Sequence, residues 1–307
     1  LASASAIVTA GANPVFADVD LNSQNITAET IAAVVTEKTK AVIVVHLAGM
    51  PAEMDVIMAL AAERGFYVIE DCAQAHGAKY KGRSVGTIGH IGAWSFCQDK
   101  IMTTGGEGGM VTTNDHALWS TMWSYKDHGK SYDAVYNRQH PPGFRWLHES
   151  FGTNWRMTEI QGVLGRIQLQ RMAEWTAKRQ HNGKLIDQAV ADLAIVRRVE
   201  VADYIEHAEY KHYLFVNPEQ LKDGWNRDRI VEEINASGVP AYQGSCSEIY
   251  LEKAFDNTPW RPAERLPNAL LVGESSLMFL VHPTLTEQEM NKSCDVIRRV
   301  LTEATLG

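Results

Sequence analysis

Cysteine is scarce in this chain, and the way it is distributed narrows the class of protein. The 307 residues include four cysteines, and no two of them form a Cys-x-x-Cys pair. This spacing disfavours zinc sites, iron–sulfur clusters and a disulfide framework, so we expect a cytoplasmic protein without a metal ion. No apolar run approaches the length of a membrane span. The first residues lack a basic leader and an initiator methionine, and we expect that sequence upstream of Leu1 is missing.

Basic residues are also in deficit. The chain has 29 lysines and arginines against 37 aspartates and glutamates, which gives a formal net charge of -8. This balance argues against general binding to nucleic acid or to an anionic membrane, although a local pocket can still hold an anion. Hydrophobic residues make up 45% of the chain, enough for a large core. From the length we expect two unequal domains, a large one over 1–182 and a smaller one over 183–307.

The first half alternates short apolar runs with helical patterns. Strands are expected at 41–46, 66–69, 93–97 and 110–113, and a helix at 52–64 between Pro51 and Gly65. This rhythm predicts an α/β fold with a mainly parallel sheet flanked by helices. Ligands of such sheets lie outside the carboxyl ends of the strands. Asp71 and Lys100 each follow a strand closely, so we expect them in one crevice.

The pattern changes after residue 126. Residues 126–153 form a long connection rich in aromatic residues, among them Phe144, which either lines a pocket or subunit contact or is a plain surface loop. Thr158 and Gln161 form a predicted capping box, and the apolar positions 160, 163, 164 and 167 follow at helical spacing. A smaller α+β region is expected beyond it. There we predict a strand at 213–216, a helix at 227–236 and a final helix after a second capping box at Thr286.

Three short segments combine residue types that carry chemistry. Taken singly, their lysine, aspartate, glutamine, serine and asparagine have ordinary explanations as surface, turn or capping residues. The glycines of the second segment lack the Gly-Lys-Ser/Thr ending of a phosphate-binding loop, so we expect a tight turn there. The segments are Glu-Asp-Cys-Ala-Gln-Ala-His-Gly at 70–77, Gly-Ala-Trp-Ser-Phe-Cys-Gln-Asp-Lys at 92–100 with Thr-Thr-Gly-Gly-Glu-Gly-Gly at 103–109, and Gly-Thr-Asn-Trp-Arg-Met-Thr-Glu at 152–159.

Together these segments resemble the DegT/StrS family of pyridoxal-phosphate-dependent sugar aminotransferases, which has the fold of the aspartate aminotransferase superfamily. The resemblance implies that Lys100 binds pyridoxal 5'-phosphate covalently as a Schiff base and is the catalytic residue. It implies that Asp71 pairs with the pyridine nitrogen, and that Gln74 contacts the phenolic oxygen of the ring. Ser95 is implied to bind the phosphate, and Asn154 to reach it from a neighbouring subunit. The expected assembly is therefore a homodimer with shared active sites.

The reaction implied by the resemblance moves an amino group from an amino acid, glutamate or glutamine, to a nucleotide-linked keto sugar. A sugar dehydratase of the same family is an alternative, but one dehydratase branch replaces the lysine with histidine and another needs an iron–sulfur cluster. A non-catalytic nucleotide-binding or regulatory relative is a further alternative. The family's phosphate-binding Gly-Thr segment and the aromatic residue that stacks on the ring are expected upstream of Leu1.

Overall fold

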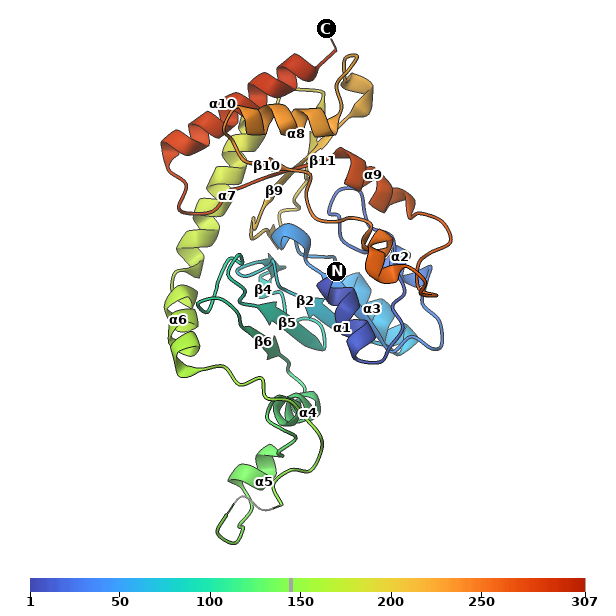
Figure 1. Cartoon of the computed structure of the whole chain (residues 1–307), viewed down its shortest axis with the longest axis vertical. Coiled ribbons are helices and arrows are strands. Elements are labelled where there is room, and N and C mark those ends of the chain that lie inside the picture. The colour runs from blue at the N-terminus through green and yellow to red at the C-terminus, as the bar shows by residue number, and fades with distance from the viewer. Residues whose placement is uncertain (144–145, 307) are drawn as a thin grey trace.

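Runs rich in β-branched residues form the central sheet. The computed structural model describes residues 1–143 and 146–306, so Phe144 lies outside the described residues. The central sheet has the strand order β1-β2-β5-β6 (Figure 1). Its strands are β1 (Ala41–Val45), β2 (Tyr67–Asp71), β5 (Ile91–Ser95) and β6 (Gly109–Thr112). β1, β2 and β5 are parallel, and β6 runs antiparallel to β5. The predicted α/β class with a mainly parallel sheet is confirmed.

Strand β2 reaches further than the sequence predicts. Asp71, expected just beyond the strand, is its last residue and pairs with Val45 of β1. The Asp71 carbonyl also accepts a hydrogen bond from the His46 amide at 3.1 Å, which continues the ladder past the end of β1. The Asp71 backbone is therefore fixed by the sheet and not by a free loop.

Helices at the start of the chain pack near this sheet. They are α1 (Ala2–Thr9), α2 (Ala28–Ala32) and α3 (Met54–Arg64). Helix α3 begins two residues later than predicted, and the Ala52 amide before it donates to His46 Nδ1 at 3.1 Å. It ends at Gly65, whose φ of 73° is a left-handed conformation that glycine adopts easily. Its buried residues, such as Ile57, form one core with Val44 and Val68.

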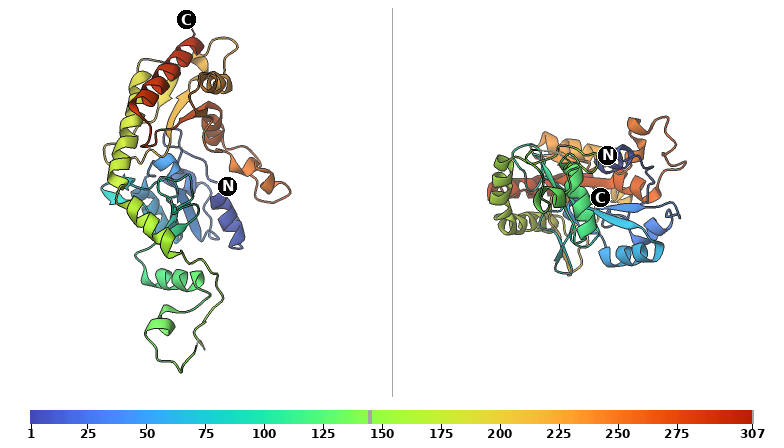
Figure 2. Two further views of the ribbon diagram at one scale, coloured as in Figure 1. Left: turned by 60° about the vertical axis from the view of Figure 1, so that its left-hand side comes forward. Right: turned by 90° about the horizontal axis from the view of Figure 1, so that it is seen from below.

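The segment from 116 to 157, here called the arm, projects away from the central sheet. It contains α4 (His116–Lys126) and α5 (Tyr132–Tyr136), and Figures 1 and 2 show both helices beyond the sheet, on the side away from the C-terminal part. Backbone bridges from Asp127 to Asn154 and from Lys130 to His148 join its two sides. The predicted connection 126–153 thus contains a short helix and local pairing.

Two consecutive helices run from the arm to the C-terminal part. Helix α6 (Glu159–Leu169) begins at the predicted capping box, in which Thr158 and Gln161 exchange hydrogen bonds. Helix α7 (Met172–Ala189) follows after a short turn. It runs without interruption through the expected domain division at residue 182, which stays a prediction.

The C-terminal layer, residues 190–306, is an antiparallel sheet covered by helices. Its strands are β7 (Val196–Arg198), β9 (His212–Val216), β10 (Ala241–Tyr242) and β11 (Ser276–Phe279), in the order β10-β11-β9-β7. Its helices are α8 (Arg227–Ala236), α9 (Pro267–Ser275) and α10 (Glu287–Ala304). Helix α10 starts at the predicted capping box of Thr286 and Glu289 and buries Met290, Ile297 and Leu301. The predicted α+β character of this region is confirmed.

A third sheet joins the two halves of the chain. It pairs β3 (Lys79–Tyr80) with β4 (Arg83–Ser84) and with β8 (Ile205–Glu206) from the C-terminal layer. Four short 3-10 segments complete the described elements: Leu47–Gly49, Pro218–Gln220, Ile249–Leu251 and Lys253–Phe255. Ala208 and Tyr210 also pack into a core formed mostly by the first half. The connector before β9, residues 207–211, therefore lies between the two halves.

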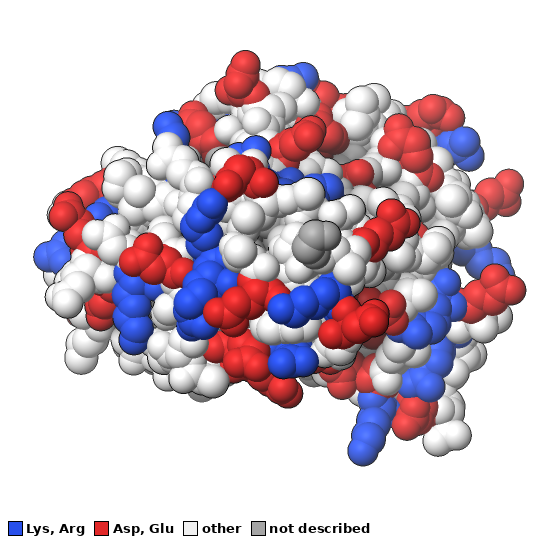
Figure 3. All heavy atoms as spheres, turned by 90° about the horizontal axis from the view of Figure 1, so that it is seen from above, with Lys and Arg blue, Asp and Glu red and all other residues white. Residues whose placement is uncertain are grey.

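The surface carries charges of both signs. On the face seen from above Figure 1, basic and acidic side chains are interspersed (Figure 3). Several form exposed pairs, such as Arg298 with Asp192 at 2.6 Å and Arg299 with Glu303 at 3.0 Å. Among the described residues, none of the helices combines the length and the apolar composition that crossing a bilayer requires.

Candidate active site

Two polar side chains end neighbouring parallel strands. Asp71, the last residue of β2, pairs with Ala93 of β5, and Ser95 ends β5 two residues later. Side chains alternate along a strand, and residues in register on parallel strands share a face. The side chains of Asp71 and Ser95 therefore lie on one face of the sheet, at its carboxyl edge. The structure brings these two predicted site residues onto the same edge.

The Asp71 carboxylate is held by two local donors. Its Oδ1 accepts from the Ala73 amide at 3.1 Å, and its Oδ2 accepts from the Ser3 hydroxyl at 2.8 Å. Ser3 belongs to α1, so the first helix lies against this edge of the sheet. A carboxylate fixed in this way can place negative charge opposite a protonated ring nitrogen.

Lys100 lies in the turn that follows β5. Its amide donates to the Cys97 carbonyl at 3.1 Å, and its side chain is only 18% exposed. The ammonium Nζ lies 3.7 Å from Asp99 Oδ2 and 5.5 Å from the centre of the Tyr210 ring. Lys100 is therefore not a solvated surface lysine, which is the ordinary expectation for a lysine taken alone.

Tyr210 and Asp99 lie beside the Lys100 amine. The Tyr210 hydroxyl donates to Asp99 Oδ2 at 3.0 Å. Burial of Asp99 opposes its ionisation, but hydrogen bonds from Cys97 and Tyr210 and the Lys100 charge outweigh it and hold the pKa of this carboxyl below its ordinary value. Burial and the Asp99 carboxylate raise the pKa of Tyr210, so its hydroxyl stays protonated as a donor.

The Gln74 side chain is oriented by the backbone of the first half. Its Oε1 accepts from the Ala48 amide at 2.7 Å. This bond fixes which end of the amide faces the protein and leaves the NH2 group to donate elsewhere. Gln74 can thus present a donor to an oxygen of a ligand.

His76 is a buried imidazole near Lys100. Its ring lies 5.3 Å from the ring of Trp94 and 5.9 Å from that of Phe96. Burial lowers the pKa of His76 to about 4, and the Lys100 and Arg179 charges act in the same direction. Within the described residues neither ring nitrogen has a well-aligned hydrogen-bond partner. Within the described residues, the neutral ring therefore has hydrogen-bonding capacity that is not used.

The glycine-rich segment 103–109 is a tight turn between β5 and β6. The Phe96 amide donates to the Gly108 carbonyl at 2.8 Å, and the Thr104 amide donates to the Phe96 carbonyl at 3.2 Å. Gly105 and Gly106 have φ of 82° and 139°, which side chains rarely tolerate. The segment closes the Lys100 turn and does not have the form of a phosphate loop, in agreement with the sequence interpretation.

Asn154 lies apart from these residues, on the arm. Its Oδ1 accepts from Arg156 Nε at 3.1 Å, and its backbone pairs with Asp127. Arg156 Nη1 lies 3.4 Å from Asp127 Oδ1, and the ammonium groups of Lys126 and Lys130 lie 3.9 and 3.8 Å from the same carboxylate. Three cations around one carboxylate leave this part of the arm positively charged.

A buried anchor holds the sheet beneath the site. The Glu70 carboxylate accepts from His46 Nε2 at 3.0 Å and from the amides of Gly86, Ile88 and Gly89 at 2.7, 2.8 and 2.6 Å. Burial opposes ionisation, but these donors lower the pKa of Glu70 below its ordinary value. The anchor thus joins the end of β1, β2 and the loop before β5.

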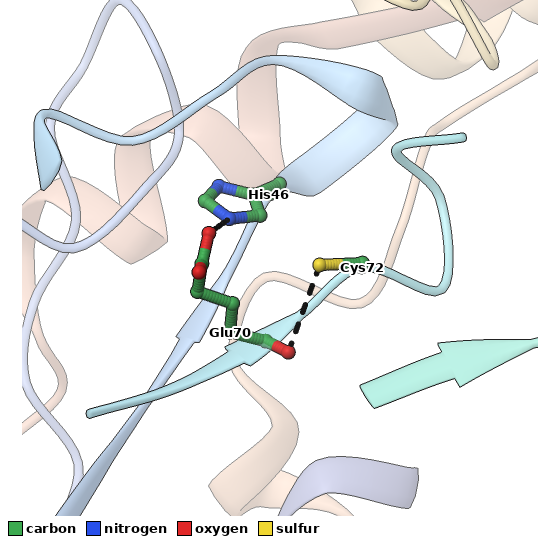
Figure 4. Close-up of side chains that lie close together, drawn as sticks. All are labelled: His46, Glu70 and Cys72. Carbon is green, nitrogen blue, oxygen red and sulfur yellow. Dashed lines mark hydrogen bonds and ion pairs between the residues drawn. The ribbon is translucent and has the colours of Figure 1, made fainter. Parts of the chain in front are cut away.

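Cys72 completes this buried group, and the three side chains lie close enough to suggest a metal site (Figure 4). The ligand atoms of His46, Glu70 and Cys72 lie within 4.8 Å of one another. However, His46 Nδ1 already accepts from the Ala52 amide, and both Glu70 oxygens carry two hydrogen bonds. Burial raises the pKa of the Cys72 thiol, which opposes the thiolate that a metal needs. The group is best explained as a structural anchor.

Sequence reasoning missed Tyr210 and Asp99 as neighbours of Lys100, and Arg179, which donates to the Tyr210 carbonyl. Tyr210 and Arg179 lie far from Lys100 in the chain, in the connector before β9 and in α7, and neither belongs to a recognisable motif. Asp99 adjoins Lys100 in sequence, but an exposed aspartate beside a lysine carries no signal of its own. The packing of the connector between the two halves is what brings them together.

The predicted residues fit the group that the resemblance implies. Asp71 offers a carboxylate for a ring nitrogen, Gln74 an amide donor for a phenolic oxygen, and Ser95 a hydroxyl. Lys100 offers a shielded amine for covalent attachment. This set of donors matches pyridoxal phosphate, whereas a nicotinamide dinucleotide needs a Gly-x-Gly-x-x-Gly turn after a strand.

Comparison with known proteins identifies the family. The sequence model of the DegT/DnrJ/EryC1/StrS aminotransferase family matches residues 1–298. An aminotransferase structure from Psychrobacter cryohalolentis is 62% identical, with a TM-score of 0.96 over 99% of this chain and 79% of that one. The GDP-perosamine synthase of Caulobacter vibrioides is 34% identical over 98% of this chain and 76% of its own length.

A second curated relative is the UDP-N-acetyl-3-dehydro-alpha-D-glucosamine 3-aminotransferase of Acidithiobacillus ferrooxidans. It is 32% identical over 98% of this chain and 75% of its own length. These matches extend over the central sheet, the arm and the C-terminal layer alike. The chain therefore belongs to the DegT/DnrJ/EryC1/StrS family of aminotransferases.

Proposed function

We propose that the chain transfers an amino group from glutamate or glutamine to a nucleotide-linked keto sugar, using pyridoxal phosphate bound through Lys100. The observation that carries this proposal is the shielded Lys100 amine in the turn after β5, the strand that pairs with β2 and its terminal Asp71. The names of the two curated relatives, one acting on a GDP-linked and the other on a UDP-linked sugar, support a nucleotide sugar as the acceptor. The amino sugars so made would serve polysaccharide biosynthesis.

Each predicted residue has a defined task in this reaction. Pyridoxal phosphate supplies an electron-poor ring that stabilises negative charge on the substrate carbon. Asp71 holds the ring nitrogen protonated, and Gln74 donates to the phenolic oxygen with the NH2 group that its bond to Ala48 leaves available. The Ser95 hydroxyl binds the phosphate. The Lys100 amine would take a proton from the substrate carbon and deliver it two atoms away, across the nitrogen that is being transferred.

A cofactor-trapping experiment tests the Lys100 assignment. Full-length protein loaded with pyridoxal phosphate is reduced with borohydride and digested, and the labelled peptide is expected to contain Lys100. Lys100→Ala should abolish both the label and amino transfer. Lys79→Ala is the matched control, because Lys79 forms an exposed pair with Glu206 at 3.0 Å and should remain dispensable. A label on another lysine would refute the assignment.

We also propose that the enzyme is a homodimer, because α6 and the arm expose an apolar surface that a second copy would cover. Ile160 is 76% exposed and Phe151 is fully exposed, and Val163, Ile167 and Trp155 are exposed as well. The predicted apolar stripe of α6 therefore lacks a partner within the described chain. Exposed apolar surface of this extent is typical of a protein interface.

The dimer would supply Asn154 to the neighbouring active site. Within one protomer, Asn154 lies on the arm and Lys100 lies in the turn after β5. A site shared between two subunits would bring these two motif residues together. Mixing inactive Lys100→Ala and Asn154→Ala proteins tests this arrangement. Hybrid dimers should regain activity, because one of their two sites has both intact residues. If each site lies within one subunit, mixing will restore nothing.

A further inference from the structure

Lys211 is a second lysine beside Lys100, and its charge is not neutralised. Its Nζ lies 4.9 Å from the centre of the Tyr210 ring, the same ring over which Lys100 Nζ lies at 5.5 Å. The Lys211 side chain is half-buried. Among the described residues its ammonium group has no ion pair or hydrogen bond. A half-buried cation without a partner is costly, and such groups are typical of anion-binding sites.

The buried Arg179 guanidinium adds positive charge near Lys211. It is only 6% exposed, and its Nη1 donates to the carbonyls of Glu209 and Tyr210 at 3.4 and 3.3 Å, directly beside Lys211 in sequence. Burial lowers the pKa of Lys211, and the Arg179 and Lys100 charges lower it further against the opposing effect of Asp99. A bound anion would relieve this repulsion.

The nearby carboxylates are already engaged. Glu209 Oε2 pairs with His212 Nδ1 at 3.2 Å. Asp99 accepts from Tyr210 and lies near Lys100. Three cations, Lys100, Arg179 and Lys211, thus lie near two carboxylates that already have partners.

His282, from the C-terminal layer, lies near Arg179 and Lys211. Asn182 of α7 donates to the carbonyls of Val281 and His282 at 3.2 and 3.4 Å, which holds this segment against the helix. Burial lowers the pKa of His282, and the Arg179 and Lys211 charges contribute. The cations therefore lie where the connector, α7 and the segment after β11 meet.

We propose that Lys211 binds the carboxylate of the amino-acid donor, an inference that rests on the proposed function of Lys100. The carboxylate that flanks the amino group is attached directly to the carbon from which Lys100 removes a proton. It must therefore lie near the Lys100 amine, and Lys211 Nζ lies over the same Tyr210 ring as that amine. In the acceptor, the whole sugar ring separates the diphosphate from most of its carbons. Arg179, which is buried and bonded to carbonyls, adds charge without touching the substrate.

Substitutions of Lys211 test this subsite directly. Lys211→Met keeps much of the side-chain volume and removes the charge, and Lys211→Arg keeps the charge. Lys222→Met is the matched control, because Lys222 also lies over an aromatic ring, 5.4 Å from the centre of Trp225, but is exposed and belongs to the C-terminal layer.

Two measurements are made on these variants. In the holoenzyme, the half-reaction with L-glutamate is followed by cofactor absorbance, and Lys211→Met should raise its Michaelis constant about 10- to 100-fold, the loss expected for one charge-assisted hydrogen bond. In the cofactor-free chain, calorimetry measures binding of succinate, which should weaken to a similar degree. Lys211→Arg should restore most of both, and Lys222→Met should match the wild type.

Binding of GDP and UDP tests whether Lys211 contacts the nucleotide part of the acceptor. If Lys211→Met weakens these nucleotides and leaves L-glutamate unaffected, the lysine binds the acceptor and the proposal is overturned. If neither ligand responds, Lys211 is a solvated side chain and the proposal is also overturned.

The same data separate this proposal from the proposed function. Failure of the loaded wild type to accept an amino group, with succinate binding still dependent on Lys211, would refute the transaminase assignment alone. An unchanged Michaelis constant for L-glutamate in a Lys211→Met enzyme that still transfers the amino group would refute the carboxylate subsite alone.

Discussion

Replacing Glu70 with glutamine should destabilise the fold strongly, although the two side chains have the same shape. The carboxylate is fully buried and accepts four hydrogen bonds, from His46 and from the amides of Gly86, Ile88 and Gly89. A glutamine amide offers one oxygen and one NH2 group, so two of the four donors would face another donor. An unsatisfied buried donor costs about 1–3 kcal/mol. We therefore expect Glu70→Gln to cost about 2–6 kcal/mol.

The effect should depend on pH with a definite sign. The pKa of Glu70 is lowered from 4.5, so the folded state binds its proton less readily than the unfolded state does. Its contribution to the free energy of unfolding is then fully present above about pH 4.5 and is lost as the pH falls through the folded pKa. The gap between wild type and Glu70→Gln should accordingly narrow on acidification.

Urea unfolding followed by circular dichroism at pH 7 and at lower pH measures both effects. Glu206→Gln is the matched control, because Glu206 forms an exposed pair with Lys79, and exposed pairs contribute about 0–1 kcal/mol. If Glu70→Gln costs no more than Glu206→Gln, or if the gap does not change with pH, the anchor does not hold the sheet as inferred.

Three further predictions concern the core and the junction of the two halves. Burial favours the neutral His212 ring, but Glu209 and Asp187 raise the pKa of His212 to about 10. The stabilising contribution of His212 is therefore full below about pH 6.5 and declines toward pH 10. His212→Gln should remove this decline from thermal unfolding curves. Gly77→Ala should lower stability by about 1–3 kcal/mol, more than Gly82→Ala does, because both glycines have positive φ but only at Gly77 would the added Cβ meet a side chain, 2.5 Å from Thr176 Oγ1. Treatment with EDTA should leave the melting temperature unchanged, and a clear drop would show that the group in Figure 4 holds a metal ion.

The sequence determined the elements whose signals are local. The strand runs, the glycine that ends α3 and the capping boxes at Thr158 and Thr286 each depend on residues a few positions apart, and all are present in the structure. The motif segments around Asp71 and Lys100 were placed correctly near strand ends, although β2 extends two residues beyond its predicted end and includes Asp71. The α/β class and the family followed from these signals.

Only the tertiary structure decided what surrounds Lys100. Tyr210, Arg179 and Lys211 come from a helix and a connector with no motif. Tyr210 lies beside the amine, and Arg179 and Lys211 contact Tyr210, because the connector packs between the two halves of the chain. The apolar stripe of α6 illustrates the same point, since helical spacing predicted the stripe but could not decide whether this chain or a second one covers it. Long-range packing depends on the fit of whole surfaces, and spacing within one segment carries no information about it.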